Sequence, residues 1–213
     1  HSVLIYAEGK IHLAFGNYQQ AVKLFDEALK FVTHDRGILI NQSWSLFTKA
    51  LIGEHEEAIR QIEIIRLEAI QRQWIEVWVK ASTHLGLIFY LSGKIEDSLK
   101  TLQEVGQKAE ELGFSAAGTA FVYVKAMEAV RRSDFLKARE YGTSILEKAE
   151  KEKSLWLQWI ALDILIKSVT AEDENCVKYR TKIKSVLREI NQSKPNWIDF
   201  EINPKKPPLF GLV

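Results

Sequence analysis

Residues 85–113 read LGLIFYLSGKIEDSLKTLQEVGQKAEELG, which is typical of two helices joined by a tight turn. Gly93 supplies the turn, because glycine readily adopts the left-handed backbone conformation that follows a helix. Gly86 and Ser98 are small, so we expect the two helices to cross closely there, with large apolar side chains such as Leu102 filling the space between them. This segment therefore predicts a helical hairpin.

The same plan recurs along the chain. Turn residues stand at Gly16, Gly53, Gly93 and Ser133, which are 37, 40 and 40 residues apart. A fixed period in this range is the mark of a stack of helical repeats. We therefore predict four hairpins and two further helices, at about 2–34, 37–72, 73–113, 115–152, 154–170 and 173–191.

Proline marks where the helical part ends. The chain has 213 residues and four prolines, and the first of these is Pro195. Because proline breaks the backbone hydrogen bonds of a helix, its absence before this point permits continuous helices. The predicted fold is all-α: a right-handed α-solenoid of four hairpins plus two C-terminal helices over 1–192, followed by a proline-rich, extended tail over 193–213.

A resemblance to a known family follows from the positions of small and large residues. Leu85, Gly86 and Phe89 match the first helix of the tetratricopeptide repeat, and Ala21, Phe25 and Ala28 match its second helix. The period of about 40 residues resembles the longer repeats in sensor domains of maltose-regulator-type transcription activators and in some eukaryotic scaffold proteins. Glu8-Gly9 departs from the usual Leu-Gly pair. The resemblance implies a fold that binds other proteins, without naming the partner.

In such a stack, the first helix of each hairpin lines a concave face that accepts extended or helical peptides. Aligning the hairpins on their turns gives the residues that we expect on this surface, called here the predicted face. The alternative is that part of this set is buried between the repeats. The predicted face comprises Tyr6, Lys10, Ser43, Phe47, Thr83, Leu87, Tyr90, Tyr123, Met127 and Arg131.

The predicted face is apolar and aromatic. Some related repeat proteins clamp an acidic C-terminus with lysine and asparagine, but only Lys10 and Arg131 are basic here. We therefore expect a protein or peptide partner and a non-catalytic scaffold module within a larger regulatory protein. The alternative is a ligand-sensing or oligomerising segment of a transcriptional or signalling regulator.

Other function classes find little support in the composition. With 29 basic and 28 acidic residues, the net charge of +1 offers no general attraction to nucleic acid or to an anionic membrane. No apolar run approaches the roughly 20 residues that span a bilayer. The five histidines form no ligand pair at helical spacing, and Cys176 is the only cysteine. We expect no metal, no cofactor, no enzymatic activity, and a cytoplasmic protein.

The tail is too apolar to remain in water. We expect it to dock through Trp197, Phe200 and Phe210 on helical surface. Its own last helices are the favoured site, because the tail is tethered beside them. Docking on a neighbouring copy, which would cause self-association, is the alternative.

Overall fold

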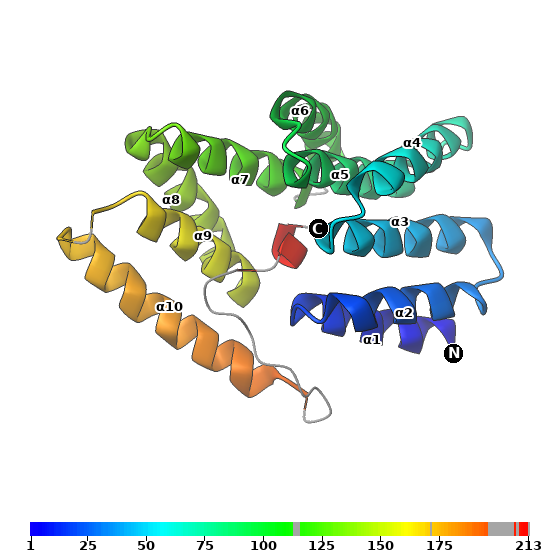
Figure 1. Ribbon diagram of the computed structural model, residues 1–213, viewed down its shortest axis with the longest axis horizontal. Helices are drawn as coiled ribbons and strands as arrows, with labels where there is room; N and C mark the ends of the chain where they lie inside the picture. Colours follow the sequence, from blue (N-terminus) through cyan, green and yellow to red (C-terminus); the bar gives the residue numbers. More distant parts are fainter. Residues whose placement is uncertain (113–115, 171, 196–206, 208, 213) are drawn as a thin grey trace. The chain divides into compact units, whose positions relative to one another are not determined.

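The computed structural model describes residues 1–112, 116–170, 172–195, 207 and 209–212, and α-helices dominate them (Figure 1). No strand occurs in these ranges, which confirms the predicted all-α class. The elements are α1 (Ser2–Ala14), α2 (Tyr18–Leu29), α3 (Asp35–Leu51), α4 (His55–Gln71), α5 (Ile75–Leu91), α6 (Ile95–Glu111), α7 (Ala116–Arg131), α8 (Phe135–Lys151), α9 (Leu155–Lys167), α10 (Glu174–Ser193) and the 3₁₀ turn η1 (Leu209–Leu212).

All four predicted turn residues adopt a left-handed backbone conformation. Their φ angles are +83° at Gly16, +105° at Gly53, +79° at Gly93 and +60° at Ser133. The first three are glycines, which adopt this conformation without steric cost. Ser133 holds it despite having a Cβ. The turn positions are therefore confirmed.

The chain forms two compact units, residues 1–121 and residues 122–212, and the division falls inside α7. A single repeat domain over 1–192 stays a prediction.

In the first unit, α1 packs on α2, α2 on α3, α3 on α5, α4 on α5, and α5 on α6. The crossing of α5 and α6 is as close as the sequence predicts. Ser98 Oγ donates a hydrogen bond to the Gly86 carbonyl at 2.7 Å, and a Cβ on Gly86 would collide with Leu102. Gly9 on α1 is similarly close to Phe25 on α2. Glycine thus lets the two helices of both hairpins approach.

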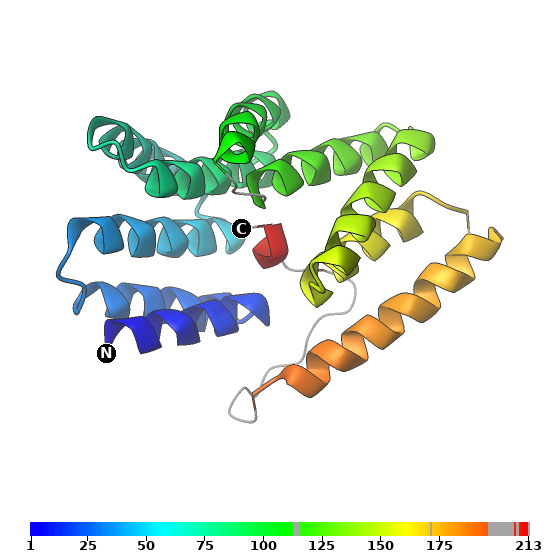
Figure 2. The same ribbon diagram turned by 180° about the vertical axis from the view of Figure 1, so that it is seen from behind.

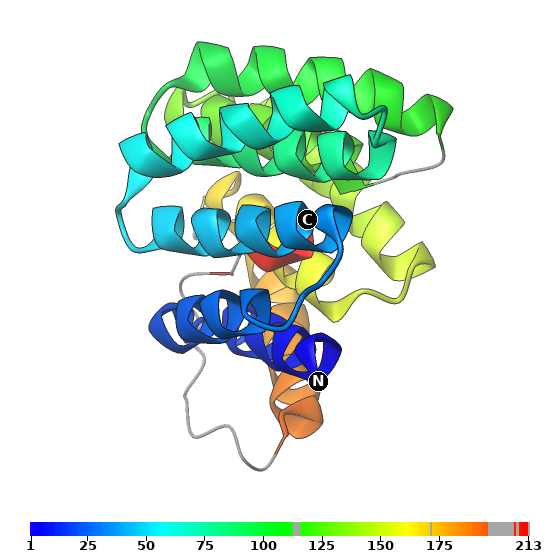
Figure 3. The same cartoon turned by 90° about the vertical axis from the view of Figure 1, so that its right-hand side faces the viewer.

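The centre of the first unit is aromatic. The rings of Phe25 and Trp44 stack with centroids 6.2 Å apart, and Phe47 stacks on His84 at 4.8 Å. Ser43 Oγ lies 2.6 Å from Nδ1 of His84, which joins α3 to α5 by a buried polar contact. Figures 1 and 3 both show α3 between α2 and α4.

In the second unit, α9 is the central helix. It is buried almost all round, and it packs against α8, α10 and η1 (Figure 2). Gly142 on α8 allows the approach, since a Cβ there would lie 3.1 Å from Ile164 and from Leu165. A helix that is apolar on every side needs neighbours on every side, which α9 obtains.

The end of the tail departs from the extended conformation that the sequence predicts. Residues 209–212 form one 3₁₀ turn, in which residues i and i+3 point the same way. Leu209 and Leu212 are both buried, and a Cβ on Gly211 would lie 3.1 Å from Cβ of Trp156 on α9. The tail thus docks on its own chain by leucines. Trp197 and Phe200 lie outside the described residues, as does the side chain of Phe210.

Candidate functional site

The predicted face is largely buried. Ser43, Phe47, Thr83, Leu87 and Tyr123 are inaccessible to solvent or nearly so. Tyr6, Lys10, Tyr90 and Met127 are half-buried, and Arg131 is exposed. A partner would therefore not reach half of these side chains in this structure, and for that half burial between helices is the observed arrangement.

Contacts between α3 and α5 explain the burial in the first unit. Ser43 and Phe47 on α3 both contact His84 on α5. Burial holds the pKa of His84 well below its usual range, and the nearby Lys80 and Lys10 lower it further. His84 is therefore a buried, neutral packing residue, which Ser43 contacts by a hydrogen bond and Phe47 by ring stacking. The residue types expected on an aromatic binding surface here build the core.

The accessible part of the predicted face in the first unit is cationic as well as aromatic. The ammonium of Lys10 lies 5.7 Å from the ring centre of Tyr6 and 5.0 Å from that of Trp44. Burial lowers the pKa of Lys10, and Lys80 on α5 lowers it further. Burial also raises the pKa of the Tyr6 hydroxyl. These groups form a cation–π cluster at the edge of the core.

Arg131, in the second unit, belongs to an ion-pair cluster. Its guanidinium donates to both carboxylate oxygens of Glu128 at 2.6 and 2.7 Å, and Arg132 donates to the same carboxylate at 2.5 Å. These hydrogen bonds and charges, above all those of Arg131, lower the pKa of Glu128 to about 2. Arg131 therefore already has a partner on its own helix.

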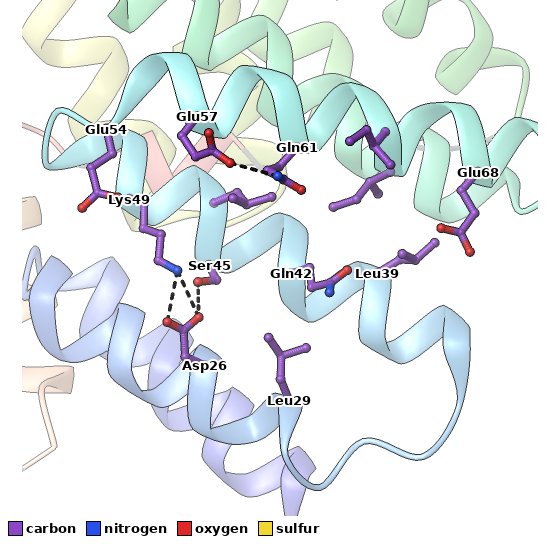
Figure 4. Close-up of a pocket in the computed structure, with 13 residues that line it drawn as sticks. Asp26, Leu29, Leu39, Gln42, Ser45, Lys49, Glu54, Glu57, Gln61 and Glu68 are labelled. Carbon is purple, nitrogen blue, oxygen red and sulfur yellow. Dashed lines mark hydrogen bonds and ion pairs between the residues drawn. The ribbon is translucent and has the colours of Figure 1, made fainter.

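An open groove lies elsewhere in the first unit, between α2, α3 and α4 (Figure 4). Its volume is about 530 Å³, within the range of ligand-binding clefts. We call it the α3–α4 groove. It is lined by Asp26, Leu29, Leu39, Gln42, Ser45, Leu46, Lys49, Glu54, Glu57, Gln61, Ile64, Ile65 and Glu68.

Leu46 explains why the groove occurs at this hairpin. Gly9 and Gly86 each stand seven residues before a turn glycine, and Leu46 occupies the same position before Gly53. A leucine there prevents the close crossing that glycine permits. In keeping with this, α3 and α4 pack on each other less extensively than α1 on α2 or α5 on α6. Leu46 itself lines the groove and is half-buried.

The two walls of the groove differ in charge. On the α2–α3 wall, the negative charge of Asp26 is balanced by the Lys49 ammonium, 3.1 Å away (Figure 4). Asp26 also accepts a hydrogen bond from Ser45 Oγ at 2.5 Å. On the α4 wall, one helix face carries in order Glu57, Gln61, Ile64 and Glu68, so its two ends are acidic. The groove thus has an acidic rim and an aliphatic interior.

Sequence reasoning missed the groove residues, although a signal existed. Gly9 and Gly86 stand seven residues before their turn glycines, and Leu46 stands at the same position before Gly53. Comparing Gly9, Leu46 and Gly86 would have identified the hairpin whose helices stand apart.

One serine–histidine contact in the described residues has the spacing of a catalytic pair. Ser43 and His84 lie within hydrogen-bond distance, like a nucleophile and its base, but both are buried beneath aromatic rings. Within the described ranges, no three histidine, cysteine or acidic side chains gather as metal ligands would, and no helix has the length and apolar character to cross a membrane.

Comparison with family models, with curated proteins and with solved structures finds no match to this chain.

Proposed function

We propose that the chain is a non-catalytic protein-binding module, built as a tetratricopeptide-like right-handed solenoid of hairpins, and that its binding site is the α3–α4 groove. The repeat interpretation is supported by the recurring turns at Gly16, Gly53, Gly93 and Ser133 and by the equivalent close crossings at Gly9 and Gly86. A stack of this kind exposes long grooves suited to a segment of another protein.

One observation carries the choice of site: an aliphatic interior left open to solvent. Ile64 lines the groove with 56% of its surface exposed, beside the half-buried Leu46 and Leu29. Covering these apolar side chains with a partner is favourable, by about 25 cal/mol for each Å² of apolar surface removed from water. Much of the predicted face, in contrast, is already covered by the chain itself.

A peptide-display selection against the folded chain tests this function. We expect selected peptides to lose at least about tenfold in affinity on Ile64→Glu, because the charge would lie in the apolar interior. Leu136→Glu is the matched control, since Leu136 on α8 is 71% exposed and lies outside the groove. Selected peptides that bind both variants equally well would contradict the proposal, as would a selection that yields no binder.

A further inference from the structure

The side chains that line the rim of the α3–α4 groove are mainly acidic. Four acidic residues and one lysine line the groove, and that lysine, Lys49, is engaged by Asp26. Glu54 forms no ion pair with any residue in the described part of the chain. Glu57 pairs with Arg60, and Glu68 lies 2.9 Å from Arg72, which also pairs with Asp35. Such exposed ion pairs contribute little to stability, so breaking them to admit a basic side chain of a ligand costs little.

The negative charges stand at both ends of the aliphatic interior. Glu54 and Glu57 lie beside the end of α3 that carries Lys49, and Glu68 lies near Leu39 at the other end (Figure 4). Glu57 and Glu68 are eleven residues apart on one face of α4, a rise of about 16 Å. Leu46, Ile64 and Ile65 lie between these ends. A complementary ligand is therefore positive at two ends and apolar between them.

The walls favour a helical ligand over an extended one. An extended peptide that docks through its backbone needs a free strand edge, and α2, α3 and α4 offer none because their backbone groups bond within each helix. A helix satisfies its own backbone and packs its side chains between the ridges of neighbouring helices. Residues eleven apart lie on one side of a helix, so its spacing matches that of Glu57 and Glu68.

We propose that the α3–α4 groove binds an amphipathic helix of a partner protein, with basic residues about three turns apart and leucine-like side chains between them. This rests on the proposed function and adds the chemistry of the partner. The basic residues of the ligand approach Glu57 and Glu68, and its aliphatic row covers Leu46 and Ile64.

A designed probe tests the proposal: an alanine-based peptide of about 16 residues, with two lysines about eleven residues apart and two leucines between them. Its comparison peptides carry glutamate in place of lysine, or proline at the centre. We expect fluorescence anisotropy to show at least about tenfold tighter binding of the basic probe than of either comparison peptide. Added salt should weaken the binding.

A charge-reversed chain supplies the complementary test. The double variant Glu57→Lys, Glu68→Lys should bind the glutamate peptide more tightly than the basic probe, the reverse of the unchanged chain. Glu63→Lys is the matched control, since Glu63 is exposed on α4 outside the groove and should leave the preference unchanged. Circular dichroism confirms that each variant is folded.

The outcomes separate this inference from the function beneath it. If peptides bind in a manner sensitive to Ile64→Glu but without preference for the basic helical probe, the partner chemistry is wrong and the binding function stands. If the proline peptide binds as well as the helical probe, the ligand is extended and the inference fails. If light scattering shows a dimer that the charge-reversed chain loses, a second copy occupies the groove and the inference fails.

Discussion

At the scale of a single residue, substitution of Gly86 tests the close crossing of α5 and α6. We predict that Gly86→Ala lowers the free energy of unfolding by roughly 1–3 kcal/mol, because the new methyl group collides with Leu102. Denaturant titration measures this. Gly118→Ala on α7 is the control, since a Cβ there meets nothing within 4 Å and alanine favours helix. Equal effects of the two substitutions would show that the crossing is not tight.

Glu128 predicts a pH-dependent contribution to stability. Its pKa falls from 4.5 to about 2 on folding, mainly through Arg131, so its carboxylate stabilises the folded chain above about pH 4.5. That stabilisation is lost as the pH falls through about 2, where the folded carboxyl is protonated as well. Glu128→Gln should therefore reduce stability at pH 7 and have little effect near pH 2. A difference between the two proteins that is constant with pH would contradict this cause.

At the scale of elements, Leu46 separates α3 from α4. We predict that Leu46→Ala lets the two helices approach, because the side chain that fills the crossing becomes small. Gln42 and Gln61 line opposite walls of the groove. Pulsed electron paramagnetic resonance between spin labels at these two positions should therefore report a shorter distance in the variant. Affinity for the basic probe should fall in the same variant. An unchanged distance would mean that something other than Leu46 holds the groove open.

The contact between η1 and α9 predicts that the tail stabilises the second unit. Leu212 is fully buried, and burying a leucine contributes about 1.5–3 kcal/mol. Leu212→Asp should detach the turn and lower the melting temperature, with no change in mass by light scattering. Leu136→Asp, on the exposed face of α8, serves as control. A fall in mass per particle on Leu212→Asp would instead indicate that the tail joins two copies.

The helices and turns could be predicted from the sequence because they depend on local chemistry. Apolar spacing and a left-handed residue specify a hairpin regardless of its surroundings, as Gly16 and Gly93 illustrate. Surfaces depend on contacts between distant residues. Phe47 has the character of a binding residue, but whether it faces solvent or His84 is decided by how α3 packs on α5. Periodicity along one helix carries no such information.

At the scale of the whole molecule, two compact units divide the roles of the chain. The unit of residues 1–121 contains the α3–α4 groove, and the unit of residues 122–212 holds its own tail against α9. The near-neutral net charge of +1 conceals the acidic rim. A local field of this kind acts over about 8–10 Å at physiological salt, and so attracts a basic segment once it is near.

Methyl chemical-shift mapping during titration with the basic probe tests this account most directly. If the probe binds in the α3–α4 groove, the shifted methyl resonances should belong to its lining residues Leu29, Leu39, Leu46, Ile64 and Ile65. The predicted face of the first helices would instead place the largest shifts at Leu87 and Met127. Shifts confined to the first group would support the groove, and shifts confined to the second would contradict it.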